Sequence, residues 1–186
     1  MTMQEGTKLQ ITIQDADCLS KELKDEIDIV DHLAFCVDGQ ENDDGIEWSM
    51  SSTWFVLGRL GDKLVSQIGI VDRTILAGGQ SLVIGGVGGV ATHPDFQRRG
   101  FAAMLLQAAA EQMRRRGSGD PYDFAMLFCD PKLIPYYAKS GFRQVNNPIY
   151  ILQSGRRVLF EDHQMVLPLS GKPWPEGDVE LNGPPW

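Results

Sequence analysis

The sequence predicts a single α/β (α+β) domain built on a mixed sheet. The chain has 186 residues, of which 42% are hydrophobic and 23% charged, a composition that suits one compact domain with a sizeable core over residues 1–186. Its hydrophobic pattern switches repeatedly between the two-residue period of strands and the stripes of helices. The resulting order is strand, helix, three strands, helix, strand, helix, strand, which is typical of a sheet covered by helices.

The N-terminal part predicts one strand and one helix. Residues 8–14 alternate polar and apolar side chains, as a half-buried strand does. Asp17 or Ser20 can cap a helix that runs to about Phe35. Its apolar stripe is formed by Leu19, Leu23, Ile27, Val30 and Ala34. The acidic residues of this helix are expected to form only a solvated surface: Glu22, Asp25, Glu26, Asp28 and Asp31.

An acidic segment follows between Cys36 and Met50. It contains Asp38, Glu41, Asp43, Asp44 and Glu47, followed by Trp48. One interpretation is an ordinary polar loop. The other is a substrate loop, since carboxylates beside an aromatic ring suit an amine-rich ligand.

Three antiparallel strands are predicted next. Residues 53–60 and 63–71 flank a tight turn at Gly61-Asp62, and a second turn at residues 77–80 leads into a strand that ends near Thr92. This arrangement is an antiparallel meander.

The C-terminal half alternates helices and strands. A helix is predicted from Phe101 to about Arg116, and the apolar run at residues 124–129 predicts a buried strand. A helix at 132–140, a strand at 142–145, an apolar run at 149–152 and a last strand at 164–169 follow. The tail, residues 171–186, is expected to be irregular but docked, because Trp174 and Trp186 suit a packed environment.

The segment that joins the glycine-rich strand to the helix at Phe101 is a candidate anion site. A helix N-terminus exposes about four N–H groups without intrahelical partners and carries partial positive charge. Here it is preceded by Gln97, Arg98, Arg99 and Gly100, and Gly100 and Ala102 let a diphosphate approach the backbone. The alternative is a basic helix terminus that binds no ligand.

Composition excludes several classes of function. A net charge of −8 and a pI near 4.8 argue against nucleic-acid binding. The absence of a long apolar run predicts no membrane partner, and the absence of a signal-like N-terminus predicts a cytoplasmic location. Three widely spaced cysteines predict neither a disulfide framework nor a metal site, and the three histidines are expected to be structural.

Two motifs together resemble the GCN5-related N-acetyltransferases (GNAT). Residues 97–102 match the form Gln/Arg-x-x-Gly-x-Gly/Ala, and residues 137–142 match Tyr-x-x-x-Gly-Phe. The resemblance implies the GNAT fold, with splayed strands 4 and 5 and helices on both faces of the sheet. It also implies acetyl-CoA as cofactor, with its diphosphate held by Gln97, Arg98, Arg99, Gly100, Phe101 and Ala102.

The same resemblance implies roles for the strand before the loop and for Tyr137. The main chain of Gly89, Val90, Ala91 and Thr92 would bind pantetheine, with the Val90 N–H at the thioester carbonyl. Tyr137 would be the general acid that protonates the leaving thiolate.

The sequence does not identify a single base that deprotonates the acceptor amine. Many relatives carry a Glu two residues before the position of Val90, where this chain has Gly88. Deprotonation would then use water, a loop carboxylate such as Asp38, Asp43 or Asp44, or the C-terminus of the chain at Trp186.

A closer resemblance is to the aminoglycoside 2′-N-acetyltransferases, which also end in Trp. It implies an aminoglycoside acceptor, antibiotic resistance, and a substrate site that includes Gly88 and Trp186. The acidic composition likewise favours a cationic small-molecule amine. Other amines (a polyamine, a peptide N-terminus or an amino sugar), a non-catalytic acetyl-CoA sensor and a homodimer remain alternatives to test.

Overall fold

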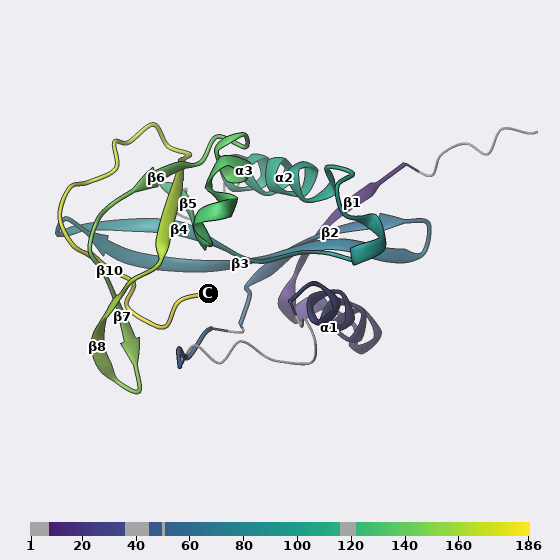
Figure 1. The fold of residues 1–186 in the computed structure, drawn as a ribbon, viewed down its shortest axis with the longest axis horizontal. Coiled ribbons are helices and arrows are strands. Elements are labelled where there is room, and N and C mark those ends of the chain that lie inside the picture. Colours follow the sequence, from purple (N-terminus) through teal and green to yellow (C-terminus); the bar gives the residue numbers. More distant parts are fainter. Residues whose placement is uncertain (1–7, 36–44, 50, 116–121) are drawn as a thin grey trace, which may run out of the picture.

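A long mixed sheet is the centre of the computed structural model, which describes residues 8–35, 45–49, 51–115 and 122–186 (Figure 1). Among these residues the sheet has ten strands. The strands are β1 (Gln10–Asp15), β2 (Trp54–Leu60), β3 (Lys63–Ala77), β4 (Gln80–Thr92), β5 (Phe124–Cys129), β6 (Arg143–Val145), β7 (Ile149–Gln153), β8 (Arg156–Phe160), β9 (His163–Pro168) and β10 (Val179–Glu180). The helices are α1 (Lys21–Phe35), α2 (Phe101–Arg115) and α3 (Ile134–Ala138).

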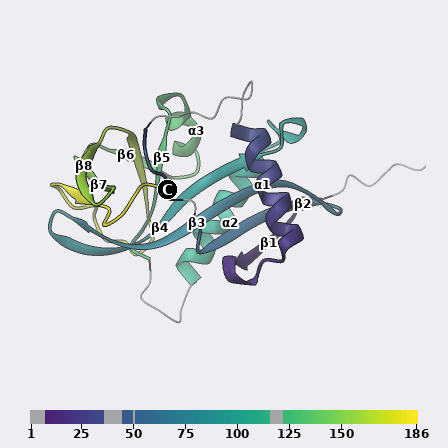
Figure 2. The same cartoon turned by 90° about the horizontal axis from the view of Figure 1, so that it is seen from below.

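Strands β2, β3 and β4 form the predicted three-stranded antiparallel meander, and β1 extends it by pairing antiparallel with β2 (Figure 2). Strand β4 then pairs with β5 in parallel. Beyond β5 the order continues through β9 and β6, both antiparallel to their neighbours. The expected mixed α+β architecture is therefore confirmed.

Strand β3 is longer than the sequence predicts, because both of its edges find partners beyond Val71. β4 pairs with it as far as Ala77. On the other edge, β2 occupies the first half of β3, and β10 pairs with Leu76 and Ala77. The long β3–β4 ribbon thus links the part of the sheet under the helices to the part that holds the C-terminal strands.

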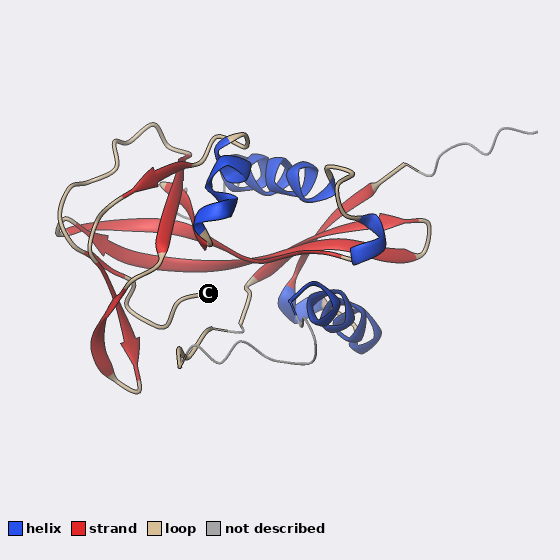
Figure 3. Cartoon of the chain, in the orientation of Figure 1, coloured by secondary structure: helices blue, strands red, loops and turns tan. Residues whose placement is uncertain are grey.

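Helices cover both faces of the sheet, α1 on one side and α2 with α3 on the other (Figures 1 and 3). The Ser20 side chain accepts a hydrogen bond from the Leu23 N–H at 3.2 Å, which confirms Ser20 as an N-terminal cap of α1. Ile27 and Val30 of α1 are buried in a cluster with Leu57, Leu64 and Ala91 of the sheet. On the other face, α2 buries Leu105, Leu106, Ala109, Ala110 and Met113.

The C-terminal half departs from the sequence prediction in two places. The helix predicted at 132–140 is a 3₁₀ turn, Pro131–Leu133, followed by the short α3. Strand β8 is missed by the sequence pattern, because four of its five residues are exposed and it lacks apolar alternation. It forms an antiparallel hairpin with β7.

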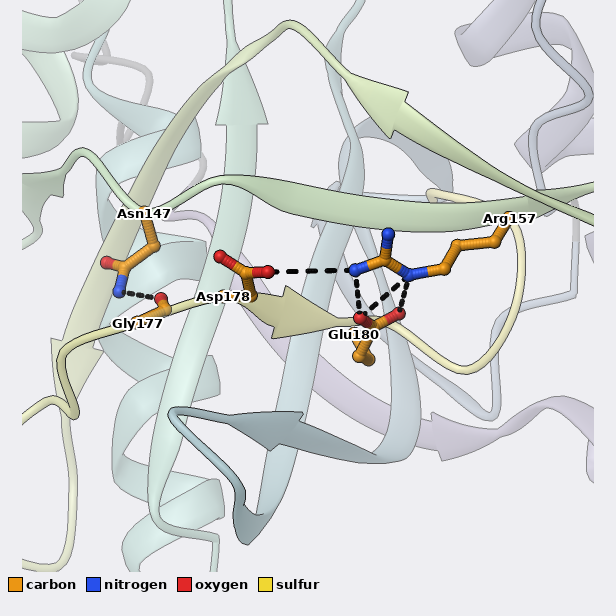
Figure 4. Close-up of polar contacts among 5 residues, drawn as sticks. All are labelled: Asn147, Arg157, Gly177, Asp178 and Glu180. Atoms are coloured by element: carbon orange, nitrogen blue, oxygen red, sulfur yellow. Dashed lines mark hydrogen bonds and ion pairs between the residues drawn. The ribbon is translucent and has the colours of Figure 1, made fainter.

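The tail, expected to be irregular, contains the short strand β10, which lies between β3 and β7. Figure 4 shows its polar contacts: Arg157 of β8 forms ion pairs with Glu180 at 2.5 Å and Asp178 at 3.7 Å. The Asn147 side chain donates to the Gly177 carbonyl at 2.6 Å (Figure 4). These contacts and the strand pairing position the last residues, which end beside the middle of the sheet on the α1 side (Figure 1).

Candidate active site

Strands β4 and β5 separate at the centre of the sheet. They pair only from Ile84 to Gly86 on β4 and from Phe124 to Met126 on β5. Beyond Gly86 the main chain of β4 keeps its pairing with β3 but is not paired with β5 in the part of the chain that the structure describes. This is the predicted splay, and it leaves backbone donors and acceptors of β4 available to a ligand.

A β-bulge interrupts β4 at the same place. The register changes between the pairs Gly69–Gly88 and Gln67–Ala91, so that β4 carries one extra residue. Gly89 adopts φ +53°, a conformation that other residues rarely take, and it is exposed. Among the described residues, the atom nearest to a Cβ atom placed on Gly89 would be Asp31 Oδ1, at 3.7 Å. The bulge is therefore an open surface of backbone at the splay.

The loop after β4 leads directly into α2. Residues 97–100 are exposed, and positive φ angles at Arg98 (61°) and Gly100 (79°) turn the chain into the first helical residue, Phe101. A Cβ atom on Gly100 would meet nothing within 4 Å. The N–H groups of a helix start and nearby arginines are groups that can bind a diphosphate, so this loop is a candidate phosphate cradle.

Side-chain contacts hold this loop in shape. The Gln97 amide donates to the Thr92 carbonyl at 3.2 Å. Arg99 donates to the Asp95 carbonyl at 3.3 Å and stacks over the ring of Phe96, which is 5.2 Å from its guanidinium carbon. Gln97 and Arg99 thus support the loop, while the Arg98 side chain is exposed.

Tyr137 is buried on α3, with a relative exposure of 6%. Its ring packs against Tyr136 and Phe142 at centroid distances of 5.2 and 6.2 Å. Burial raises the pKa of Tyr137 above its ordinary value, and the nearby Cys129 and Tyr136 add to the effect. Burial also raises the pKa of the Cys129 thiol, to about 11. Both groups are therefore neutral near pH 7, and Tyr137 carries the proton that a general acid needs.

On the α1 side of β4, two glycines pack against Trp186. A Cβ atom on Gly86 would lie 2.6 Å from Trp186 Cδ2, and one on Gly88 would lie 3.2 Å from its carbonyl carbon. Arg73 donates to the Pro184 carbonyl at 2.5 Å, and its guanidinium carbon lies 5.1 Å from the Trp186 ring centroid. Gly88 and Trp186, which the sequence assigned to the substrate site, are thus in direct contact.

The expectation that every acidic residue of the first helix is merely solvated is wrong for Asp31. It is half-buried, and its Oδ1 accepts a hydrogen bond from Gln67 Nε2 at 3.1 Å. Burial, followed by the negative charge of Asp28, raises the pKa of Asp31, while the Gln67 hydrogen bond partly opposes that rise. The spacing contained the signal: Asp31 lies four residues after Ile27 and three before Ala34, and both belong to the apolar stripe.

Asp38, Asp43 and Asp44 lie outside the described residues. The end of the same acidic segment is described, and there Glu47 accepts hydrogen bonds from Ser154 N at 3.2 Å and Oγ at 2.5 Å. The Ser49 N–H donates to the Pro185 carbonyl at 2.6 Å. This part of the segment is therefore packed against the β7–β8 turn and the tail. No helix within the described ranges is long and apolar enough to cross a bilayer.

Comparisons with known proteins agree with this geometry. The acetyltransferase (GNAT) domain model matches residues 22–145. The Escherichia coli GNAT family N-acetyltransferase YhbS, solved with CoA, superposes with a TM-score of 0.65 at 16% identity, covering 98% of this chain and 94% of that one. A Brucella melitensis GNAT acetyltransferase in complex with acetyl-CoA gives 0.60 at 20% identity, covering 91% and 94%.

Some structural matches are to longer proteins. A conserved protein from Enterococcus faecalis V583 gives a TM-score of 0.57 at 16% identity, covering 74% of this chain, which spans only 33% of that protein. No curated protein matches the sequence. The family model covers about two thirds of the chain and includes the splayed strands, the bulge, the loop and Tyr137, so the chain belongs to the GNAT acetyltransferase family.

Proposed function

We propose that this protein transfers the acetyl group of acetyl-CoA to a primary amine of a cationic small molecule. Acetyltransferase activity and the use of acetyl-CoA follow from membership of the family. The observation that carries the proposal is the open backbone of the Gly89 bulge at the splay, followed within the same segment by the cradle at Gly100.

The donor side is assigned as follows. The exposed loop and the start of α2 bind the diphosphate, through Gln97, Arg98, Arg99, Gly100, Phe101 and Ala102. The main chain of residues 89–92 aligns the pantetheine arm, and the Val90 N–H donates to the acetyl carbonyl oxygen. When bound, acetyl-CoA supplies the activated acetyl thioester. Tyr137 delivers a proton to the leaving sulfur, for which its raised pKa keeps it protonated.

The acceptor side is assigned to the α1 face of β4. Gly88 lies beside the bulge, and Trp186 lies against Gly88. The net charge of −8 attracts a cationic acceptor, and Asp38, Asp43 and Asp44 are proposed to contribute to that field. An aminoglycoside is the first candidate, while a polyamine, a peptide N-terminus and an amino sugar share the same chemistry.

The test is acetyl-CoA consumption with thiol release, measured with gentamicin, kanamycin, tobramycin, spermidine and a short peptide. Turnover with the aminoglycosides alone would support the antibiotic-modifying function. Turnover only with spermidine or the peptide would keep the enzyme class and reject the aminoglycoside acceptor. Acetyl-CoA binding without turnover on any of these amines would favour the sensor, an alternative that rests on the absence of a carboxylate at Gly88.

A further inference from the structure

We infer that Asp31 is the base that deprotonates the acceptor amine, and that Gln67 is the residue that positions it. This inference rests on the proposed function. Asp31 brings a side-chain carboxylate to the bulge, since its Oδ1 would be 3.7 Å from a Cβ atom on Gly89. It therefore borders the segment that is proposed to align the thioester.

The second observation concerns the side-chain amide of Gln67. Gln67 is 2% exposed, and its Nε2 is committed to Asp31 at 3.1 Å. Its other amide atom, Oε1, is buried and has no hydrogen-bond partner among the residues that the structure describes. A buried acceptor without a partner costs free energy, so it calls for an N–H or O–H donor from a molecule that binds there. An ammonium group offers three donors, enough to serve both Asp31 and Gln67 Oε1.

The proton balance is complete with these groups. Asp31 accepts one proton from the acceptor ammonium, which frees the nitrogen lone pair. That pair forms the C–N bond to the acetyl carbon as the C–S bond breaks, and the sulfur leaves with the bonding electrons. Tyr137 gives its proton to the sulfur and regains one from the acylated nitrogen through water, and Asp31 releases its own proton to solvent.

The surroundings of Asp31 favour its protonated form. Gln67 faces it from β3 and Gly89 from β4, and Asp28 on its own helix is the charged neighbour among the described residues. Because burial raises its pKa, Asp31 holds a captured proton more strongly than an exposed carboxylate does.

The decisive variant is Asp31→Asn, which keeps an oxygen for the Gln67 hydrogen bond and removes the base. We expect kcat/KM for the amine to fall roughly 100-fold or more at pH 7, with acetyl-CoA affinity unchanged. The defect should shrink as the pH approaches the pKa of the amine, because the acceptor then arrives deprotonated. Asp25→Asn, an exposed site on the same helix with the same loss of charge, should change the rate less than twofold. An Asp31→Asn enzyme as fast as the wild type at pH 7 would overturn the proposal.

A second measurement does not depend on turnover. The carboxyl ¹³C signal of Asp31 is titrated by NMR with CoA bound, with and without saturating spermidine. A bound ammonium should lower the Asp31 pKa, and Gln67→Leu should raise it by removing the hydrogen bond that opposes the burial effect. If neither spermidine nor Gln67→Leu shifted the Asp31 pKa, Asp31 and Gln67 would be rejected as an amine site, even if none of the amines is acetylated. Turnover by wild type with no response of Asp31 would reject the inference and leave the proposed function intact.

Discussion

Strand β4 and the loop that follows it use glycines in two opposite ways. Trp186 occupies the space that a side chain at Gly86 or Gly88 would need, so this packing favours glycine at both positions. Gly89 and Gly100 have positive φ angles and open space around the missing side chain. The first pair stabilises the fold, whereas the second leaves backbone free for a ligand. We call the surroundings of Gly86 and Gly88 the packed side, and the surroundings of Gly89 and Gly100 the open side. Substitutions on the packed side should alter stability, and substitutions on the open side should alter function.

Tyr137→Phe should give the largest loss of activity. Removing the hydroxyl leaves the ring packing against Tyr136 and Phe142 in place, so the melting temperature should stay close to that of the wild type. We expect kcat to fall roughly 100- to 10,000-fold in steady-state assays, with acetyl-CoA affinity unchanged. Tyr136→Phe, on the half-buried neighbour, is the matched control and should keep its rate. An unaltered kcat in Tyr137→Phe would remove Tyr137 from the chemistry.

Gly86→Ala tests the packed side. The new methyl group would overlap the Trp186 ring, and the shift needed to fit it should cost about 1–3 kcal/mol in the free energy of unfolding. Chemical denaturation of Gly86→Ala, Trp186→Ala and the double variant would measure the coupling. The cost of Gly86→Ala should largely vanish in the Trp186→Ala background. Equal costs in both backgrounds would show that the ring does not limit residue 86.

Arg98→Ala and Arg99→Ala test whether the open side binds acetyl-CoA. Each side chain that contacts a phosphate should contribute about 1–3 kcal/mol to acetyl-CoA binding, measured by calorimetry. Because Arg99 also holds the loop through Asp95 and Phe96, its variant should show a further small loss of thermal stability that Arg98→Ala lacks. Arg114→Ala, an exposed arginine near the other end of α2, is the control. Affinities equal to that control would separate the two arginines from the diphosphate.

Asp31→Asn should produce the smallest change in stability, and its sign is informative. A raised pKa means that folded Asp31 binds its proton more tightly than the unfolded chain does, so ionisation destabilises the fold as the pH rises above about 4. The variant should therefore be slightly more stable than the wild type at pH 8, while the difference should disappear at low pH. A variant that is less stable at pH 8 would mean that the charge of Asp31 stabilises the protein.

The segments proposed for the donor side could be located in the sequence because they are contiguous or carried by local motifs. The glycine-rich strand, the loop at residues 97–102 and Tyr137 are each set by short-range backbone chemistry, namely turn glycines, a helix start and a short helix. The meander and the helices α1 and α2 follow in the same way from apolar periodicity.

The acceptor side depended on contacts between residues far apart in the chain. Asp31 meets Gln67 across 36 positions, and Trp186 packs against Gly86 only because β10 pairs between β3 and β7 and holds the tail there. Local spacing could place Asp31 beside the apolar stripe of α1, but it could not predict either contact, because each contact joins residues far apart in the chain. The sequence by itself therefore determined the fold class and the donor motifs. The tertiary structure decided which glycines pack against Trp186, which glycines stay open, and that Asp31 lies beside the bulge, because these contacts join distant parts of the chain.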